Sequence, residues 1–238
     1  TIGAYDDWIR HSVSKMSSLH FVANKKYKDR VIQLGENKNT IFAVGGLSVD
    51  NIMKTKLISK LELEKLLKIK LYKKNLLVTY HPETLEKNTL SHFKELLKVL
   101  TNFKDKLIIF TMPNDDTGNL LIHKLIKQFV KKNKNSKYFV SLGRLKYLSL
   151  AKYSDMVVGN SSSGLLEMPY LSKISINIGL RQGGRMTEES VINSKPNSKD
   201  IFKAIKKGYS YLDNSNKFKL NYFYGKGNSA KKIALILK

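Results

Sequence analysis

The chain has 238 residues, enough to bury a substantial core in one large domain or two small ones. It contains no cysteine, which excludes disulfides, thiolate zinc sites and a cysteine nucleophile. The formal net charge of +24 is compatible with nucleic-acid binding, but nearly all the basic residues are lysines scattered along the chain. We therefore expect no nucleic-acid partner.

Membrane association is not expected either. No run of residues approaches the roughly 18 consecutive apolar residues of a membrane span, and the N-terminus lacks the charged and then apolar pattern of a signal peptide. These features predict a cytoplasmic protein with no membrane partner. Because the sequence starts at Thr1 rather than at a methionine, in the middle of an α/β pattern, we expect it to be a fragment or to start inside a larger protein.

The first 75 residues predict a short α/β segment. Helices are expected at residues 6–20, 26–34 and 59–72, and short strands at residues 21–23 and 41–43. Two strands are too few to close a sheet, so this part is expected to be the end of another α/β unit. The helix at 59–72, rich in Lys, Leu and Glu, is expected to bridge two lobes.

From residue 75 onward, short apolar strands alternate with helices. Strands are expected at residues 76–80, 107–112, 138–142, 156–158 and 174–178, and helices at residues 90–103, 120–132, 144–153, 163–171 and 198–211. This alternation is typical of βαβ units. It predicts an α/β fold with a parallel, doubly wound sheet.

A turn rich in glycine and serine, GNSSSG at residues 159–164, joins a predicted strand to a predicted helix. Small residues let the backbone approach an anion closely, and the free N–H groups of a helix's first turn point toward it. One turn later, the Glu167 carboxylate could accept hydrogen bonds from a ribose diol. The pattern predicts a nucleotide diphosphate site at the carboxyl edge of the sheet, although similar turns also cap ordinary helices.

Arginine is rare in this lysine-rich chain, and its positions are Arg10, Arg30, Arg144, Arg181 and Arg185. Where lysine is the default cation, an arginine indicates a need for a planar, bidentate donor. Arg181 and Arg185 share the loop at residues 179–185. From the residues alone, Arg185 is equally well interpreted as a site residue or as a solvent-facing loop residue.

Several separated motifs, taken in order, resemble the hydrolysing UDP-N-acetylglucosamine 2-epimerases, especially the bacterial branch that begins sialic-acid and other nonulosonate synthesis. The motifs are GAYDDWIRH at residues 3–11, VTYHP at 78–82, FTMPNDD at 110–116, GNSSSG at 159–164 with Glu167, NIGLRQGGR at 177–185 and YGKGN at 224–228. Each motif is weak evidence alone, but the ordered set is specific.

The resemblance implies two Rossmann-like lobes of the GT-B type, with the nucleotide sugar in the cleft between them and no metal or redox cofactor. We expect the truncated end of the first lobe at residues 1–50, a connecting helical segment at 51–74, the nucleotide-binding lobe at 75–215, and a C-terminal loop and helix at 216–238. In the family, more of the first lobe precedes this point, so the N-terminal part is expected to be missing and apolar surface to be exposed at residues 1–50. The resemblance also implies a homodimer.

The implied chemistry is hydrolysis with inversion at C2. A base removes the C2 proton of UDP-N-acetylglucosamine while UDP leaves from C1, and water adds to the glycal intermediate to release N-acetylmannosamine and UDP. Asp6 matches a catalytic carboxylate of the family, so the resemblance implies an acid/base role for it. The alternative from the residues alone is a helix N-cap paired with Arg10.

The resemblance assigns further residues to the bound nucleotide. His81 matches a catalytic histidine close to the diphosphate, Ser161 and Ser162 match the phosphate-binding hydroxyls, with Gly164 in the same turn, and Glu167 matches the residue that holds the ribose.

The resemblance also places Arg181 in the lining of the site. Asn114 matches a loop that lies over the cleft near the sugar, although asparagine is common in turns in any case. The backbone at residues 141–143 is expected near the uracil.

Other functions remain open at this stage. A GT-B glycosyltransferase would share the phosphate and ribose contacts but would transfer the sugar to an acceptor. An epimerase acting on a UDP- or GDP-linked diacetamido trideoxy sugar would share the whole site, because the groups that recognise C4 and C6 belong to the part of the family not present here. A non-catalytic protein that binds nucleotides or nucleic acid would not depend on Asp6.

Overall fold

The structure is a computed structural model that describes residues 6–83, 88–114, 118–214 and 218–238. Within these ranges Asp6 is described by its backbone, as the first residue of a helix, but not by its side chain. The motif residues 3–5 and the turn residues 115–117 lie outside the described part of the chain.

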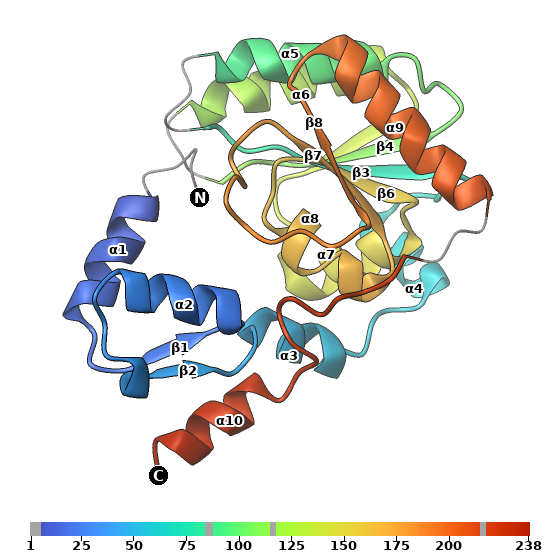
Figure 1. Cartoon of the computed structure of the whole chain (residues 1–238). Coiled ribbons are helices and arrows are strands. Elements are labelled where there is room, and N and C mark those ends of the chain that lie inside the picture. The colour runs from blue at the N-terminus through green and yellow to red at the C-terminus, as the bar shows by residue number, and fades with distance from the viewer. Residues whose placement is uncertain (1–5, 84–87, 115–117, 215–217) are drawn as a thin grey trace.

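A six-stranded parallel sheet forms the centre of the larger part of the molecule (Figure 1). Its strands are β3 (Asn75–Thr79), β4 (Leu107–Thr111), β5 (Ser136–Phe139), β6 (Met156–Gly159), β7 (Ile174–Ile178) and β8 (Val191–Ser194), in the spatial order β5-β4-β3-β6-β7-β8. The chain builds outward from β3 in one direction and then from β6 in the other. Ligands bind at the carboxyl ends of parallel strands where the order reverses, which here is between β3 and β6.

Helices cover both faces of this sheet, and alternate residues of each strand serve the two faces. On β3, Leu76 and Val78 enter one core, whereas Leu77 enters the other. The first core is covered by α5 (Thr89–Leu100), α6 (Asn119–Lys132) and α9 (Ser198–Asp213), and the second by α4 (Lys60–Leu67) and α7 (Gly143–Tyr153). The parallel α/β sheet expected from the sequence is therefore confirmed. No helix in the described ranges is long and apolar enough to cross a membrane.

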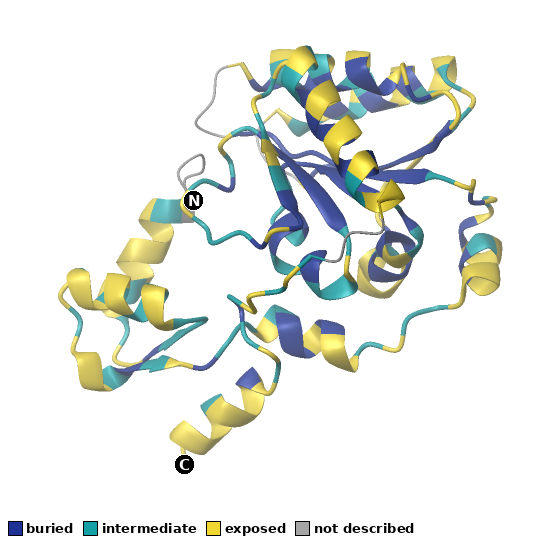
Figure 2. Ribbon diagram, turned by 45° about the vertical axis from the view of Figure 1, so that its right-hand side comes forward, coloured by how far each residue is buried: buried dark blue, intermediate teal, exposed yellow. Residues whose placement is uncertain are grey.

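The N-terminal segment, residues 6–54, is built around a separate two-stranded parallel sheet. It contains α1 (Asp6–Met16), β1 (His20–Val22), α2 (Lys25–Gln33), a 3₁₀ turn (Lys38–Thr40), β2 (Ile41–Ala43) and α3 (Leu47–Lys54). Figure 2 shows α1 largely exposed, whereas the strands of the large sheet are buried. Trp8 and Met16 are 64% and 86% exposed, as expected for a sheet too small to cover its helices.

The C-terminal segment returns from α9 to the N-terminal segment and ends in α10 (Ser229–Ile236). The buried Asp50 carboxylate on α3 accepts hydrogen bonds from the Ser229 and Ala230 amides at 2.9 and 2.8 Å, which satisfies the first turn of α10. The buried Glu188 carboxylate accepts hydrogen bonds from the Asn221 and Phe223 amides at 2.7 and 2.9 Å. The first carboxylate attaches the C-terminal segment to the N-terminal segment, and the second attaches it to the loop that precedes β8.

The prediction of a continuous helix at residues 163–171 is wrong. The structure has a short helix, α8 (Ser163–Leu166), followed by a 3₁₀ turn (Pro169–Leu171). Proline lacks the amide hydrogen that a helix interior needs, and its ring clashes with the carbonyl four residues earlier. Pro169 therefore ends the α-helix after a single turn.

Other differences concern short or marginal elements. The strand expected at residues 138–142 is β5 at Ser136–Phe139, an edge strand beyond which the apolar Val140 is 71% exposed. The sequence pattern missed β8, whose residues mix apolar and polar side chains because the strand lies at the other edge. The helix α3, which begins directly after two glycines, was not predicted. The helix predicted at residues 59–72 is α4, which ends at Leu67.

Candidate functional site

Gly159 brings the loops after β3 and β6 together. Its φ is +145°, and a Cβ atom at this position would lie 1.9 Å from the Thr79 carbonyl oxygen. No side chain fits such a contact, so only glycine allows the two strands to approach this closely. The GNSSSG turn therefore lies directly beside the end of β3, where His81 follows.

Asn160 ties these two loops to each other. Its Oδ1 accepts a hydrogen bond from the His81 amide at 2.7 Å, and its Nδ2 donates to the His81 carbonyl at 2.8 Å. The side chain is fully buried. Sequence reasoning treated Asn160 only as part of the turn. The signal that was missed is that a side-chain amide offers both N–H donors and a carbonyl acceptor, so it can bond to the N–H and the C=O of one backbone residue at the same time.

His81 is held as a neutral imidazole. It is 6% exposed, and its Nδ1 accepts a hydrogen bond from the Asn114 backbone amide at 3.2 Å, which leaves the proton on Nε2. Burial, aided by the neighbouring charge of Arg181, lowers the pKa of His81 to about 4. At neutral pH the ring therefore offers an Nε2–H donor without carrying a charge. Asn114 contributes its backbone amide, and its side chain is exposed.

The loop after β7 brings the Arg181 guanidinium next to His81 and Asn160. The Asn160 carbonyl accepts hydrogen bonds from Gln182 Nε2 at 2.8 Å and from Arg181 Nη1 at 3.4 Å. Gln182 is buried, so it fixes the loop, while Arg181 is only partly buried. Asn160 thus connects the loops after β3, β6 and β7 at the position where the strand order reverses.

The serines of the GNSSSG turn differ in their hydrogen bonds. Ser163 Oγ donates to Glu167 Oε2 at 2.5 Å, and its amide donates to Ser161 Oγ at 3.4 Å. Ser161 Oγ is thus an acceptor, and its own proton remains available to a ligand oxygen. Ser162 stands at the N-cap of α8 without a capping hydrogen bond from its side chain. Because α8 has only one turn, these hydroxyls, rather than a long helix dipole, make the turn suitable for phosphate.

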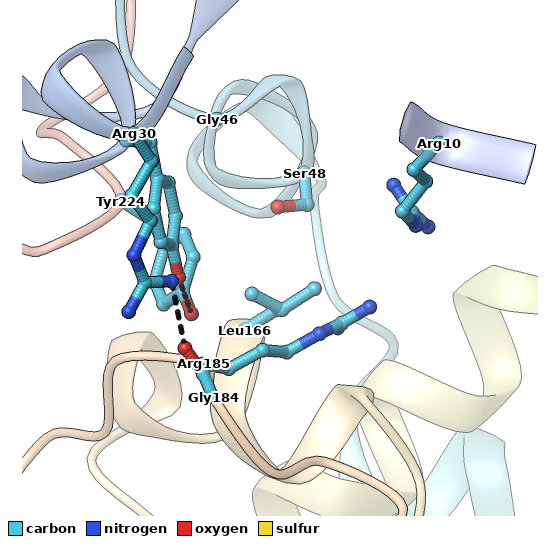
Figure 3. Close-up of a pocket in the computed structure, with 9 residues that line it drawn as sticks. Arg10, Arg30, Gly46, Ser48, Leu166, Gly184, Arg185 and Tyr224 are labelled. Atoms are coloured by element: carbon cyan, nitrogen blue, oxygen red, sulfur yellow. Dashed lines mark hydrogen bonds between the residues drawn. The ribbon is translucent and has the colours of Figure 1, made fainter. Parts of the chain in front are cut away.

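A second feature of the site is a pocket of about 360 Å³ between the N-terminal segment and the loop after β7 (Figure 3). We call it the arginine pocket, because its lining includes Arg10, Arg30 and Arg185. Figure 3 shows Arg30 directed at Gly184, whose carbonyl accepts a hydrogen bond from Arg30 Nη1 at 3.0 Å. Three of the arginines that the sequence singled out therefore lie around one cavity.

The position of Arg185, left open by the sequence, is in the lining of this pocket. Its side chain is partly buried. Burial lowers the pKa of the Arg185 guanidinium, and the positive charges of Arg10 and Arg181 act in the same direction. A group of like charges in one cavity is favourable only with an anion nearby, so the pocket is suited to a negatively charged ligand.

Tyrosines hold the N-terminal segment to the loop after β7. Tyr27 on α2 accepts a hydrogen bond from the Met186 amide at 3.1 Å, and Tyr224 donates to the Met186 carbonyl at 2.9 Å. The two phenol oxygens lie 3.2 Å apart. The position of Arg10 and Arg30 relative to Arg185 therefore depends on contacts between residues that are far apart in the sequence.

The expected site residues thus fall into two groups. His81, Asn114 and Arg181 meet around Asn160, and Ser161, Ser162, Gly164 and Glu167 follow along the next loop. The side chain of Asp6 lies outside the described part of the chain, but Arg10, one helical turn later, lines the arginine pocket. Within the described ranges no three His, Asp or Glu side chains form a group that could hold a metal ion.

Comparison with known proteins identifies the family. The family model described as UDP-N-acetylglucosamine 2-epimerase matches residues 1–238. The chain is 46% identical over 202 residues to the GDP/UDP-N,N'-diacetylbacillosamine 2-epimerase (hydrolyzing) of Campylobacter jejuni, an alignment that covers 84% of this chain and 53% of that protein. It is 41% identical over 208 residues to the polysialic acid biosynthesis protein P7 of Escherichia coli, covering 86% and 52% of the two chains.

A solved structure supports the fold. The Methanocaldococcus jannaschii UDP-GlcNAc 2-epimerase in complex with UDP-GlcNAc and UDP is similar with a TM-score of 0.73 at 20% identity, over 94% of this chain and 61% of that chain. The GT-B type architecture expected from the sequence is thereby confirmed. The chain spans about half the length of the curated relatives it matches. Since the family model matches throughout, the chain belongs to the UDP-N-acetylglucosamine 2-epimerase family.

Proposed function

We propose that this chain carries the nucleotide-binding part of a hydrolysing 2-epimerase that acts on a nucleotide-linked N-acetylated sugar. The observation that carries the proposal is the neutral, buried His81 beside Arg181, at the carboxyl edge of the sheet where the strand order reverses. This is the position at which parallel α/β sheets bind nucleotides.

His81 and Arg181 are suited to assist departure of the diphosphate. As the bond from C1 to the diphosphate breaks, negative charge develops on the phosphate oxygens. A fixed Nε2–H donor and a guanidinium stabilise this charge without reorganisation at the moment of reaction. The hydrogen bond from Asn114 keeps the imidazole in the required tautomer.

Further residues are proposed to hold the nucleotide before the reaction. Ser161 and Ser162 donate to phosphate oxygens, and the glycine at 164 leaves room for close packing, since a Cβ there would lie 3.2 Å from Ser175 Oγ. Glu167 accepts hydrogen bonds from the ribose hydroxyls. The serine hydroxyls, the glycine and the carboxylate follow one another along the chain after β6, in the order that suits binding of the phosphates and then of the ribose.

The step at C2 is assigned to the interface with the N-terminal segment. Asp6 is proposed to act as an acid/base that exchanges the C2 proton. It begins the helix that carries Arg10 into the arginine pocket, which is suited to the anionic part of a substrate. Elimination then removes the C2 proton and the nucleoside diphosphate together, and water adds to the glycal with protonation on the opposite face of C2.

The relatives favour a diacetamido sugar over UDP-N-acetylglucosamine as the substrate. The sequence led us first to UDP-N-acetylglucosamine, with N-acetylmannosamine and UDP as products and sialic-acid synthesis as the pathway. However, the Campylobacter jejuni relative at 46% identity is named for GDP/UDP-N,N'-diacetylbacillosamine. We therefore propose a 2,4-diacetamido trideoxy sugar on a UDP or GDP carrier.

Two measurements test this proposal. Isothermal titration calorimetry of this chain with UDP and with GDP comes first, because every proposed nucleotide contact comes from residues of this chain. Proton NMR in D₂O then follows UDP-N-acetylglucosamine and UDP- or GDP-linked N,N'-diacetylbacillosamine separately, with a full-length enzyme that includes this chain, since turnover by this chain alone is not expected. We expect this chain to bind at least one of the two nucleoside diphosphates, and the full-length enzyme to release it with a free sugar that carries deuterium at C2, faster with the diacetamido sugar.

Specific outcomes would contradict the proposal. Absence of binding of both UDP and GDP would overturn it. Sugar transfer to an acceptor without deuterium at C2 would indicate a glycosyltransferase instead. Asp6→Asn serves as the control, since it should keep UDP affinity and remove exchange at C2. The expected cytoplasmic location, homodimer and lack of nucleic-acid and membrane partners stay predictions.

A further inference from the structure

Behind the Glu167 carboxylate lies a chain of hydrogen bonds with a defined direction. Tyr147 Oη contacts Ser163 Oγ at 3.0 Å, and Ser163 Oγ contacts Glu167 Oε2 at 2.5 Å. An ionised carboxylate only accepts hydrogen bonds, so the single hydroxyl proton of Ser163 must point to Glu167. Ser163 therefore accepts from Tyr147, which is the donor at the start of the chain.

The Tyr147 phenol remains protonated and can therefore act as this donor. Burial raises the pKa of Tyr147 to about 12, so the phenol keeps its proton throughout the physiological range. The donor at the start of this chain of hydrogen bonds is thus not lost by titration.

We infer that Tyr147 and Ser163 are positioning residues that orient the Glu167 carboxylate for the ribose diol. This inference rests on the proposed function, in which Glu167 binds the ribose. One carboxylate oxygen, Oε2, is held by Ser163, which leaves Oε1 and the remaining lone pair of Oε2 for the two ribose hydroxyls. Fixing the carboxylate before the nucleotide arrives reduces the ordering cost of binding.

The inference separates the three consecutive serines by role. Ser161 and Ser162 remain as proposed phosphate donors, whereas the proton of Ser163 is committed to Glu167. A contribution of Tyr147 to stability alone would weaken the binding of any nucleotide equally. A positioning role affects only ligands that carry the hydroxyl groups that Glu167 reads.

The test compares UDP (or GDP, if the chain binds that carrier) with its 2',3'-dideoxy analogue, which lacks both hydroxyls that Glu167 is proposed to bind, by isothermal titration calorimetry. For Tyr147→Phe and Ser163→Ala we expect the affinity for the ribose nucleotide to fall by about three- to tenfold, the effect of one ordinary hydrogen bond. The affinity for the dideoxy analogue should change by less than about twofold, so that the preference for the ribose nucleotide narrows. Thermal melting of each variant checks that it is folded.

Tyr153→Phe is the matched control. It removes a phenol hydroxyl from the same helix, α7, where Tyr153 donates to the Ile58 carbonyl at 3.1 Å and not to a residue of the GNSSSG turn. This variant should bind both nucleotides as the parent chain does.

The outcomes distinguish this inference from the proposed function. Equal weakening of the binding of the ribose nucleotide and its dideoxy analogue by Tyr147→Phe, or no weakening of either, would overturn the positioning role while leaving the proposed function intact. A parent chain that binds the ribose nucleotide without any preference over the dideoxy analogue would overturn the assignment of Glu167 to the ribose, and with it the role of the hydrogen-bond chain behind it. A parent chain that binds neither UDP nor GDP would overturn both proposals.

Discussion

The two sheets of this molecule differ in how completely their residues and the helices packed on them are buried. The six-stranded sheet buries residues on both faces, and β3, β4 and β7 are buried along their whole length. The two-stranded sheet of the N-terminal segment buries few side chains, and α2 has no buried residue. The number of strands accounts for the difference, since a helix needs a wide sheet under its apolar face.

This contrast indicates that the sheet lobe contributes most of the stability of the molecule and the N-terminal segment contributes less. The large sheet is held by two cores and positions His81, Ser161 and Glu167 on loops that leave its carboxyl edge. The N-terminal segment is held mainly by contacts to the loop after β7 and to the C-terminal segment. Substitutions should therefore have large effects in the sheet lobe (residues 75–214) and small effects in the N-terminal segment.

The largest expected effect is that of Gly159→Ala. A Cβ atom would meet the Thr79 carbonyl oxygen at 1.9 Å, so β3 and β6 would have to separate. We expect a loss of more than about 4 kcal/mol in the free energy of unfolding, measured by urea denaturation. Gly35→Ala is the counterpart in the N-terminal segment, where φ is +90° but only Lys15 Nζ lies near, at 3.7 Å. It should lower the free energy of unfolding by about 1–2 kcal/mol, the penalty of the left-handed conformation alone. Similar losses of unfolding free energy in both variants would refute the difference between the sheet lobe and the N-terminal segment.

A pair of aromatic substitutions compares the sheet lobe with the N-terminal segment directly. Phe110→Ala removes a fully buried ring from β4 and should lower the free energy of unfolding by about 3–5 kcal/mol. Trp8→Ala removes a ring that is 64% exposed on α1 and should change it by no more than about 0.5 kcal/mol. Urea denaturation of both variants provides the comparison. A large loss for Trp8→Ala would show that α1 is covered in solution.

The burial of His81 predicts a pH dependence of stability. An unfolded chain takes up the proton near pH 6.5, whereas in the folded chain the pKa is lowered to about 4. Between these values the unfolded state binds more protons, so the free energy of unfolding should fall by about 3 kcal/mol as the pH decreases from 6.5 to 4. Urea denaturation across this range measures the slope, and His81→Asn should flatten it. An unchanged slope in His81→Asn would show that this histidine titrates normally.

The smallest of these effects is on ligand binding. Glu167→Ala should weaken UDP binding by about 1–3 kcal/mol, the loss expected for hydrogen bonds to a charged group. Glu36→Ala removes a carboxylate of the N-terminal segment that lies 2.7 Å from Lys15 Nζ, and should leave UDP affinity unchanged. Isothermal titration calorimetry of both variants is the measurement. An unchanged affinity in Glu167→Ala would contradict the ribose assignment.

Much of the fold could be predicted because hydrophobic periodicity is local. Residues such as Leu76, Leu77 and Val78 form a short apolar run, and a buried parallel strand needs such a run since both of its faces are covered. Among the strands, β8 was missed and β5 was displaced, and these two lie at the edges of the sheet, where one side of the strand remains open and the pattern is mixed.

The sequence by itself determined the class of fold, the parallel sheet and the turn at residues 159–164, because spacing and small residues are properties of neighbouring positions. It also indicated the family through motifs in a fixed order. Only the tertiary structure decided that Asn160 links three loops, that His81 is neutral, that Arg185 shares a pocket with Arg10, and that Ser163 is committed to Glu167. These properties depend on burial and on partners distant in the chain, which local sequence patterns do not encode.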